Sequence, residues 1–201
     1  MEKTCMSEVT LTGKVTKLAE KDHVCKEITF YRFYISVKRT SGAVDELPVV
    51  VSGNILNCLG LNVGDTVRVL GEYRSYSRQD ETGKKLDLFV FARGLAKCSE
   101  EEATNNHVKM EGYVCKKAKL RVTAKGRRVV DIMVAVNKNG RSWYIPCILW
   151  NLTDETISDI NPGNRIFLTG RVQSRQYHKK NGEEYETRTA YEVSVSHFAL
   201  K

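Results

Sequence analysis

Two stretches of the 201-residue chain follow one pattern and together decide the fold. The first reads Val63-Gly64-Asp65-Thr66-Val67-Arg68-Val69-Leu70-Gly71, and the second reads Pro162-Gly163-Asn164-Arg165-Ile166-Phe167-Leu168-Thr169-Gly170. They lie 99 residues apart, and Gly13 and Gly112 keep the same offset. A recurring glycine marks a backbone position that a side chain would crowd or strain. A unit this long exceeds the ~20–50 residues of a solenoid repeat, so the pattern predicts two small domains in tandem.

The boundaries follow from the same offset. We place the first domain at residues 1–97, a linker at 98–106 and the second domain at 107–201. The linker has no hydrophobic periodicity, and it contains the acidic run Glu100-Glu101-Glu102. Like charges in a short run favour an extended chain, which is typical of a connection between domains.

Each unit is predicted to contain five strands, with one short helix between the third and the fourth. Alternation of apolar residues predicts strands in the first unit at 9–15, 28–39, 47–51, 66–76 and 86–92, with the helix at 54–61. The second unit repeats the order at 108–114, 129–137, 143–150, 165–175 and 185–195, with the helix at 154–160 beginning after Thr153 or Asp154. This order is that of the OB-fold. The predicted fold class is therefore all-β, with two tandem five-stranded Greek-key barrels.

Several function classes lack their sequence signals. No segment reaches the ~18 apolar residues of a membrane span, and the N-terminus has no signal-peptide pattern, so we expect a cytoplasmic protein. None of the six cysteines forms a CxxC pair and the four histidines are isolated, so no metal site is expected. Walker, GxGxxG, GxSxG and HExxH motifs are missing. We therefore expect no enzyme, no cofactor and no small-molecule substrate.

The charge balance points to a polyanionic partner. The formal net charge is +8, and the second unit is the more basic. Seven cations and no acid occupy thirteen residues of the expected hairpin between its first two strands: Lys116, Lys117, Lys119, Arg121, Lys125, Arg127 and Arg128. Such a hairpin suits a phosphate backbone, although a solvated loop is the open alternative. The corresponding stretch of the first unit, residues 14–27, mixes lysines with acids.

Aromatic and basic residues interleave in the hairpins after both fourth strands. The second unit carries Arg175, Tyr177 and Lys179 there, and the first carries Arg74, Tyr76 and Arg78. Single-stranded nucleic acid needs cations for phosphates and flat rings for unstacked bases. Packing on the strand surface is the alternative role for the tyrosines. Trp143 and Trp150 bracket the third strand. We expect Trp143 to be partly exposed, and Trp150 either to stack on bases or to join the core.

These residues resemble the bacterial single-stranded DNA-binding protein family. The family's third-strand pattern is matched by Val49-Val50-Val51-Ser52-Gly53 and by Cys147-Ile148-Leu149-Trp150-Asn151. Its fourth-strand pattern is matched by the two stretches quoted at the outset. The ordered set occurs twice and covers nearly the whole chain.

The resemblance implies a binding site in the second unit. The family stacks bases on rings at the two ends of the third strand and in the hairpin after the fourth, which correspond here to Tyr144, Trp150 and Tyr177. The first unit has Glu46, Ser52 and Arg78 at these positions. We therefore expect it either to bind weakly, through Lys38, Arg74 and Tyr76, or to serve mainly dimerisation. The resemblance also implies a homodimer with four barrels. The chain ends at Lys201 without the family's acidic tail, so recruitment of other enzymes through such a tail is not expected.

The leading hypothesis is sequence-tolerant binding and protection of single-stranded DNA in replication, recombination or repair. Two alternatives remain open at this point. One is an OB-fold module that binds other proteins, like a primosome scaffold. The other is RNA binding by the same surface, since only contacts to the 2′-hydroxyl separate the two nucleic acids.

Overall fold

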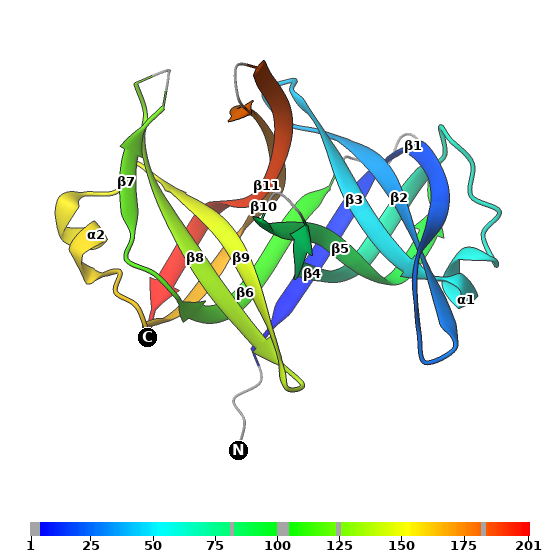
Figure 1. Cartoon of the computed structure of the whole chain (residues 1–201), viewed down its shortest axis with the longest axis horizontal. Coiled ribbons are helices and arrows are strands. Elements are labelled where there is room, and N and C mark those ends of the chain that lie inside the picture. The colour runs from blue at the N-terminus through cyan, green and yellow to red at the C-terminus, as the bar shows by residue number, and fades with distance from the viewer. Residues whose placement is uncertain (1–4, 81–82, 100–104, 124–125, 182–183) are drawn as a thin grey trace.

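The computed structural model forms two closed β-barrels that share one continuous sheet (Figure 1). It describes residues 5–80, 83–99, 105–123, 126–181 and 184–201. Across these residues the strands are hydrogen-bonded in the order β2-β3-β5-β4-β1-β6-β10-β11-β9-β8-β7. Additional β1–β2 and β6–β8 pairings close a barrel in each half. The predicted pair of OB-folds is confirmed.

The first barrel comprises five strands and one short helix. Its elements are β1 (Ser7–Cys25), β2 (Ile28–Lys38), β3 (Val44–Ser52), α1 (Gly53–Leu56), β4 (Thr66–Asp80) and β5 (Gly83–Lys97). The strand order matches the prediction, but the helix is shorter than the predicted 54–61. Gly60 has a φ of +51°, in the left-handed region, so a right-handed helix cannot continue through it.

The second barrel repeats this plan with one extra strand. Its elements are β6 (Asn106–Val114), β7 (Lys119–Val122), β8 (Arg128–Lys138), β9 (Arg141–Trp150), α2 (Asp154–Asp159), β10 (Arg165–Asn181) and β11 (Glu184–Leu200). The Thr153 side chain accepts a hydrogen bond from Thr156 N and caps α2, as one of the two predicted caps. β7 was not predicted, because a four-residue strand in a cation-rich stretch has little periodicity to detect.

Glycines hold the strands of each barrel close together. A Cβ on Gly71 would lie 2.2 Å from Phe91 O, and a Cβ on Gly170 would lie 2.2 Å from Ser194 O. Both glycines stand at a register shift between the fourth and fifth strands of their barrel. A β-bulge at this place bends the strand pair around the barrel. The repeated glycines therefore mark backbone contacts, as predicted.

The two barrels are joined through β1 and β6. These strands pair antiparallel, and Val9 lies opposite Val108, its own counterpart in the repeat. A local two-fold axis therefore passes between these two residues. Buried side chains of both barrels form one hydrophobic cluster across this junction. The single chain thus builds internally what two identical subunits would build as a dimer.

A buried carboxylate on β4 adds a polar contact between the barrels. Glu72 is 3% exposed and accepts hydrogen bonds from Arg74, Arg93 and Lys138, the last residue of β8. Burial raises the pKa of this carboxyl, but the three cationic donors outweigh that effect and lower it to about 2.

This depressed pKa predicts a loss of stability in acid. The contribution of the Glu72 carboxylate to the free energy of unfolding is complete above its ordinary pKa of 4.5. This contribution disappears as the pH falls through about 2. We expect this carboxylate to contribute up to about 3 kcal/mol to the free energy of unfolding at neutral pH. Urea unfolding between pH 5 and pH 2 would measure it. The Glu72→Gln variant should lose less stability over this interval, and equal losses in the two proteins would contradict the assignment.

Candidate nucleic-acid interface

The side chains of β9 alternate between the interior of the second barrel and its outer surface. Trp143, Ile145, Cys147 and Leu149 point into the barrel and are at most 8% exposed. The intervening residues therefore face outward, which places Tyr144 and Trp150 on the same side of one strand. Six residues of strand separate these two rings by about 20 Å.

The same face continues onto β11 and β10. β11 runs parallel to β9 with Ser194 beside Ile148, and it runs antiparallel to β10 with Arg171 opposite Ser194. Val172 is buried inside the barrel, so the alternate residues of β10 face outward. They include Arg175 and Tyr177.

Three rings therefore lie on this surface, which we call the outer face and define by Tyr144, Trp150, Arg175 and Tyr177. Tyr144 is 45% exposed and Tyr177 is 37% exposed. Trp150 is half-buried, and its indole Nε1 donates to Ser194 Oγ at 2.9 Å, which fixes the orientation of the ring. The guanidinium of Arg175 lies 5.9 Å from the centre of the Tyr177 ring. The face thus offers flat rings with a cation beside one of them.

The basic stretch before β8 lies beside this face. The β7–β8 and β10–β11 arms project on the same side of the molecule (Figure 1). Lys116, Lys117, Lys119 and Arg127 are exposed. Lys125 lies outside the described residues, as does the side chain of Lys179.

The fold brings acidic side chains next to this stretch, although its own sequence contains none. Arg121 forms two hydrogen bonds with Asp131, at 2.6 and 3.1 Å, and the bond to this carboxylate raises the pKa of the guanidinium. Arg128 forms an ion pair with Asp154. These acids come from β8 and α2, so the sequence window around the cations did not contain them. Two of the predicted cations are thus already paired.

Trp143 and Arg74 do not lie on the outer face. Trp143 is only 8% exposed, so the prediction of partial exposure was wrong. Its ring lies 4.7 Å from the guanidinium of Arg74, which comes from the other barrel and is also bonded to Glu72. Burial lowers the pKa of this guanidinium, and Glu72 opposes the shift. The two residues form a contact between the barrels. The sequence signal for the burial of Trp143 was that it has the same phase along the strand as Ile145.

The remaining candidates lie on the first barrel. Tyr76 is 62% exposed, and Arg78 forms an ion pair with Asp87 at 3.1 Å. Lys38 is exposed at the end of β2. The Glu46 carboxylate, which stands at the position of Tyr144, pairs with Lys17. No ring of the first barrel therefore stands at the three family positions.

The structure reveals a groove on the first barrel that sequence reasoning missed. A cavity of about 420 Å³ lies between the β1–β2 and β4–β5 hairpins. Lys17 covers the ring of Tyr34 at 4.4 Å, and Arg32 is bonded to both Asp22 and Asp87. The alternation of β2 could have indicated that Arg32 and Tyr34 face outward together. Acids pair with Lys17, Arg32 and Arg78, which lowers the free positive charge of this groove.

Metal and membrane sites are not indicated by the geometry. Within the described residues, no three His, Cys, Asp or Glu side chains gather as a metal site would require. None of the helices in the described part of the chain is long and apolar enough to cross a lipid bilayer.

Comparison with known proteins relates this fold to one family. The model of the single-strand binding protein family matches residues 105–200, which is the second barrel. The chain is 29% identical over 104 residues to single-stranded DNA-binding protein 3 of Streptococcus agalactiae, covering 47% of this chain and 72% of that protein. It is 30% identical over 86 residues to the single-stranded DNA-binding protein of Enterococcus faecalis, covering 39% of this chain and 46% of that protein.

A solved structure resembles the whole molecule. The crystal structure of the wild-type single-stranded DNA binding protein from Thermus aquaticus superposes with a TM-score of 0.75 at 20% sequence identity. The superposition covers 98% of this chain and 94% of that one, so the two share their fold. The match of residues 105–200 shows that the second barrel is similar to the single-strand binding protein family, and the superposition shows the fold of the whole chain.

Proposed function

We propose that the chain binds single-stranded DNA with little sequence preference, through the outer face of the second barrel. The observation that carries the proposal is the common face of Tyr144, Trp150 and Tyr177, derived from the pairing of β9, β10 and β11. The relatives are named single-stranded DNA-binding proteins, which supports the same ligand.

The chemistry of the face suits a single strand. Unstacked bases stack on the exposed rings, and each ring contributes about 1–3 kcal/mol, whichever base it meets. Arg175 beside Tyr177 supplies a positive charge at the ring. Lys116, Lys117 and Lys119 extend the positive charge along the path of the phosphates. In a duplex the bases are already paired and stacked, so these rings have nothing to contact.

We further propose how the protein is used. The chain acts as a homodimer with four barrels in the cytoplasm, and it protects single strands during replication, recombination or repair. The first barrel contributes weak contacts at Lys38, Tyr76 and Arg78, because it has no ring at the three family positions. Mass measurement by light scattering tests the dimer, for which a mass near twice the 22.8 kDa of one chain is expected.

The lysines at the start of the basic stretch should set part of the salt dependence. Each phosphate contact on a single strand adds about −0.7 to the slope of log K against log salt concentration. Replacing both Lys116 and Lys117 by glutamate is therefore expected to flatten the slope by about 1.4 if each lysine contacts one phosphate. Titrations with poly(dT) at several salt concentrations measure it.

The control for this experiment has the same change in charge. Lys109 and Lys201 are exposed beside Thr169 and Arg165 in the first part of β10, away from Tyr177, and their joint replacement by glutamate leaves the outer face intact. This control should keep the slope nearly unchanged. Equal flattening in the two variants would assign the effect to net charge and would remove the two lysines from the interface.

Competition among three polymers tests the proposed ligand. The protein should bind poly(dT) much more tightly than duplex DNA at equal salt. Tighter binding to poly(U) than to poly(dT) would assign the face to RNA. Failure to bind any of the three would leave a protein-binding module as the function of these barrels.

A further inference from the structure

The β10 arm carries Arg175 and Tyr177, and its backbone has a free edge. β10 pairs with β6 only as far as Gly170 opposite Val108. Beyond that residue the strand continues to Asn181 with β11 on one side only. Backbone N–H and C=O groups on such an edge need partners, because an unpaired buried group is costly. The position of the arm therefore depends on what satisfies this edge.

The first two edge residues are bonded by side chains instead of by a strand. Asn106 bonds both the N–H and the C=O of Val172, at 2.9 and 2.7 Å. Two residues farther along, Asp45 Oδ1 accepts from Ser174 N at 2.7 Å, and Arg39 Nη2 donates to Ser174 O at 2.7 Å. Asp45 and Arg39 belong to the first barrel. Together they act as a short substitute strand on the arm of the second barrel.

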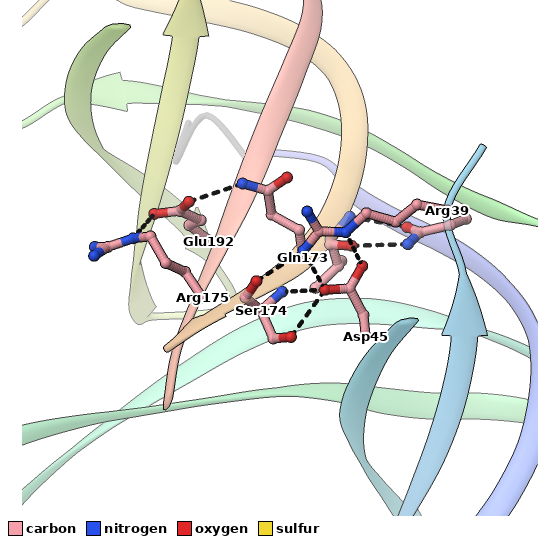
Figure 2. A network of polar contacts seen from close by, with 8 residues as sticks. Arg39, Asp45, Gln173, Ser174, Arg175 and Glu192 are labelled. Atoms are coloured by element: carbon pink, nitrogen blue, oxygen red, sulfur yellow. Dashed lines mark hydrogen bonds and ion pairs between the residues drawn. The ribbon is translucent and has the colours of Figure 1, made fainter. Parts of the chain in front are cut away.

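This contact between barrels is built around a buried charge. Asp45 is fully buried, and it also accepts from Ser174 Oγ at 2.8 Å and from Arg39 Nε and Nη2 at 2.6 and 2.5 Å (Figure 2). A buried ion pair often adds little net stability, because desolvation offsets the attraction between the charges. A group with four such bonds does fix the position of the backbone that it holds. The bonded backbone lies three residues from Tyr177.

A second carboxylate continues the contact toward the outer face. Glu192 on β11 is 5% exposed. Its Oε1 accepts from Gln173 Nε2 at 2.8 Å, and its Oε2 lies 3.7 Å from Arg175 Nε (Figure 2). The residues on both sides of Ser174 are thereby held in place. Arg175 in turn lies beside the ring of Tyr177.

The start of β9 is held by the first barrel as well. Tyr144 N donates to Ser75 Oγ at 2.8 Å, and Arg74 lies over the ring of Trp143. Ser75 and Ser174 are counterparts in the repeat, so the local two-fold axis places them in the same way. The chemistry differs on the two sides: the Asp45–Arg39 ion pair meets Ser174, whereas a serine hydroxyl meets Tyr144.

We propose that Asp45, together with Arg39, is a positioning residue for the single-strand site, through which the first barrel holds Tyr177 and Arg175 at their place on the outer face. This inference rests on the proposed function. It gives the first barrel, which lacks the three rings, a role in binding that requires no contact between Asp45 and the nucleic acid. The strands that carry Tyr144 and Tyr177 are both bonded to side chains of the first barrel.

A double-mutant cycle tests the proposal. Asp45→Ala should weaken poly(dT) binding by about threefold to tenfold in the otherwise unchanged protein. In a Tyr177→Ala background the same replacement should cost clearly less, because the ring that Asp45 positions is already missing and only the effect through Arg175 remains. A role confined to stability predicts equal effects in both backgrounds. Asp45→Asn keeps an oxygen acceptor for Ser174 and should recover most of the affinity.

The matched control breaks another partly buried ion pair. Glu111 bonds Arg165 at 2.9 Å near the far end of β10. Glu111→Ala should lower stability without changing poly(dT) affinity. If Asp45→Ala does not fold, Ser174→Ala is the second variant, because it removes one bond to Asp45 without leaving an unpaired charge. Its affinity loss should also be smaller in the Tyr177→Ala background, and the difference between the two backgrounds should be smaller than for Asp45→Ala.

The outcomes separate the two proposals. An affinity loss that becomes clearly smaller in the Tyr177→Ala background supports the positioning role. Unchanged affinity in Asp45→Ala, or a loss of equal size in both backgrounds, overturns it while single-strand binding stands. Absence of poly(dT) binding by the unchanged protein overturns the proposed function, and the positioning role with it.

Discussion

Replacing Trp150 and Tyr177 together by alanine is expected to weaken poly(dT) binding by at least about thirtyfold. Each stacked ring is worth about 1–3 kcal/mol, so two rings account for about 2–6 kcal/mol if they act independently. The fold should survive, because Tyr177 is 37% exposed and the ring of Trp150 is half-buried. Equilibrium titration followed by the anisotropy of a labelled oligo(dT) gives the affinity without relying on tryptophan emission.

The control for this variant is an aromatic residue on the same strand. Phe167 lies on β10, ten residues before Tyr177 and thus about 30 Å away along the strand. Phe167→Ala removes a partly buried ring and should change stability more than affinity. An affinity loss as large as that of the double variant would show that general destabilisation, and not ring stacking, explains the result. Unchanged affinity in the double variant would refute the proposal that the outer face binds the single strand.

Gly170→Ala is expected to destabilise the protein by about 3 kcal/mol or more, a cost in the upper range for a single substitution. The added Cβ would lie 2.2 Å from Ser194 O, which is backbone and cannot rotate away. β10 and β11 would have to separate where the bulge bends them around the barrel. Urea unfolding of the variant and of the unchanged protein measures the difference.

A second glycine separates crowding from backbone strain. Gly163 has a φ of +91° but no atom within 4 Å of an added Cβ. Gly163→Ala should therefore cost only about 1–2 kcal/mol, the penalty for an L-residue in the left-handed region. If Gly170→Ala cost no more than Gly163→Ala, the strands at the bulge would be less tightly held than the structure shows.

The parts of the fold that depend on local pattern could be predicted from sequence. The order of strands and the Thr153 cap rest on residues close together in the chain, and the repeat of 99 residues rests on comparing such local patterns. The structure has all three. Helix α1 was predicted too long because Gly60 was treated as an ordinary residue of a helical turn. β7 was missed because its stability comes from pairing with β8, and not from its own four residues.

The candidate site was likewise predictable in part from the sequence. Tyr144, Trp150 and Tyr177 follow from the family pattern, and the strand pairing places them on one face. The polar turn before Trp143 predicts exposure, but the residue has the same phase along β9 as the core residue Ile145 and is therefore buried. The partners of Asp45, Arg74 and Arg128 could not be predicted. Each lies across a contact that only the assembled barrels create.

The most direct test of ring stacking uses the fluorescence of a single tryptophan. Trp143→Phe removes the buried indole and keeps an aromatic ring beneath Arg74, so Trp150 becomes the sole emitter. Stacking of a base on Trp150 predicts strong quenching by poly(dT) and little change with duplex DNA at the same salt. Binding of poly(dT) that leaves the Trp150 emission unchanged would contradict the claim that the single strand runs over the outer face.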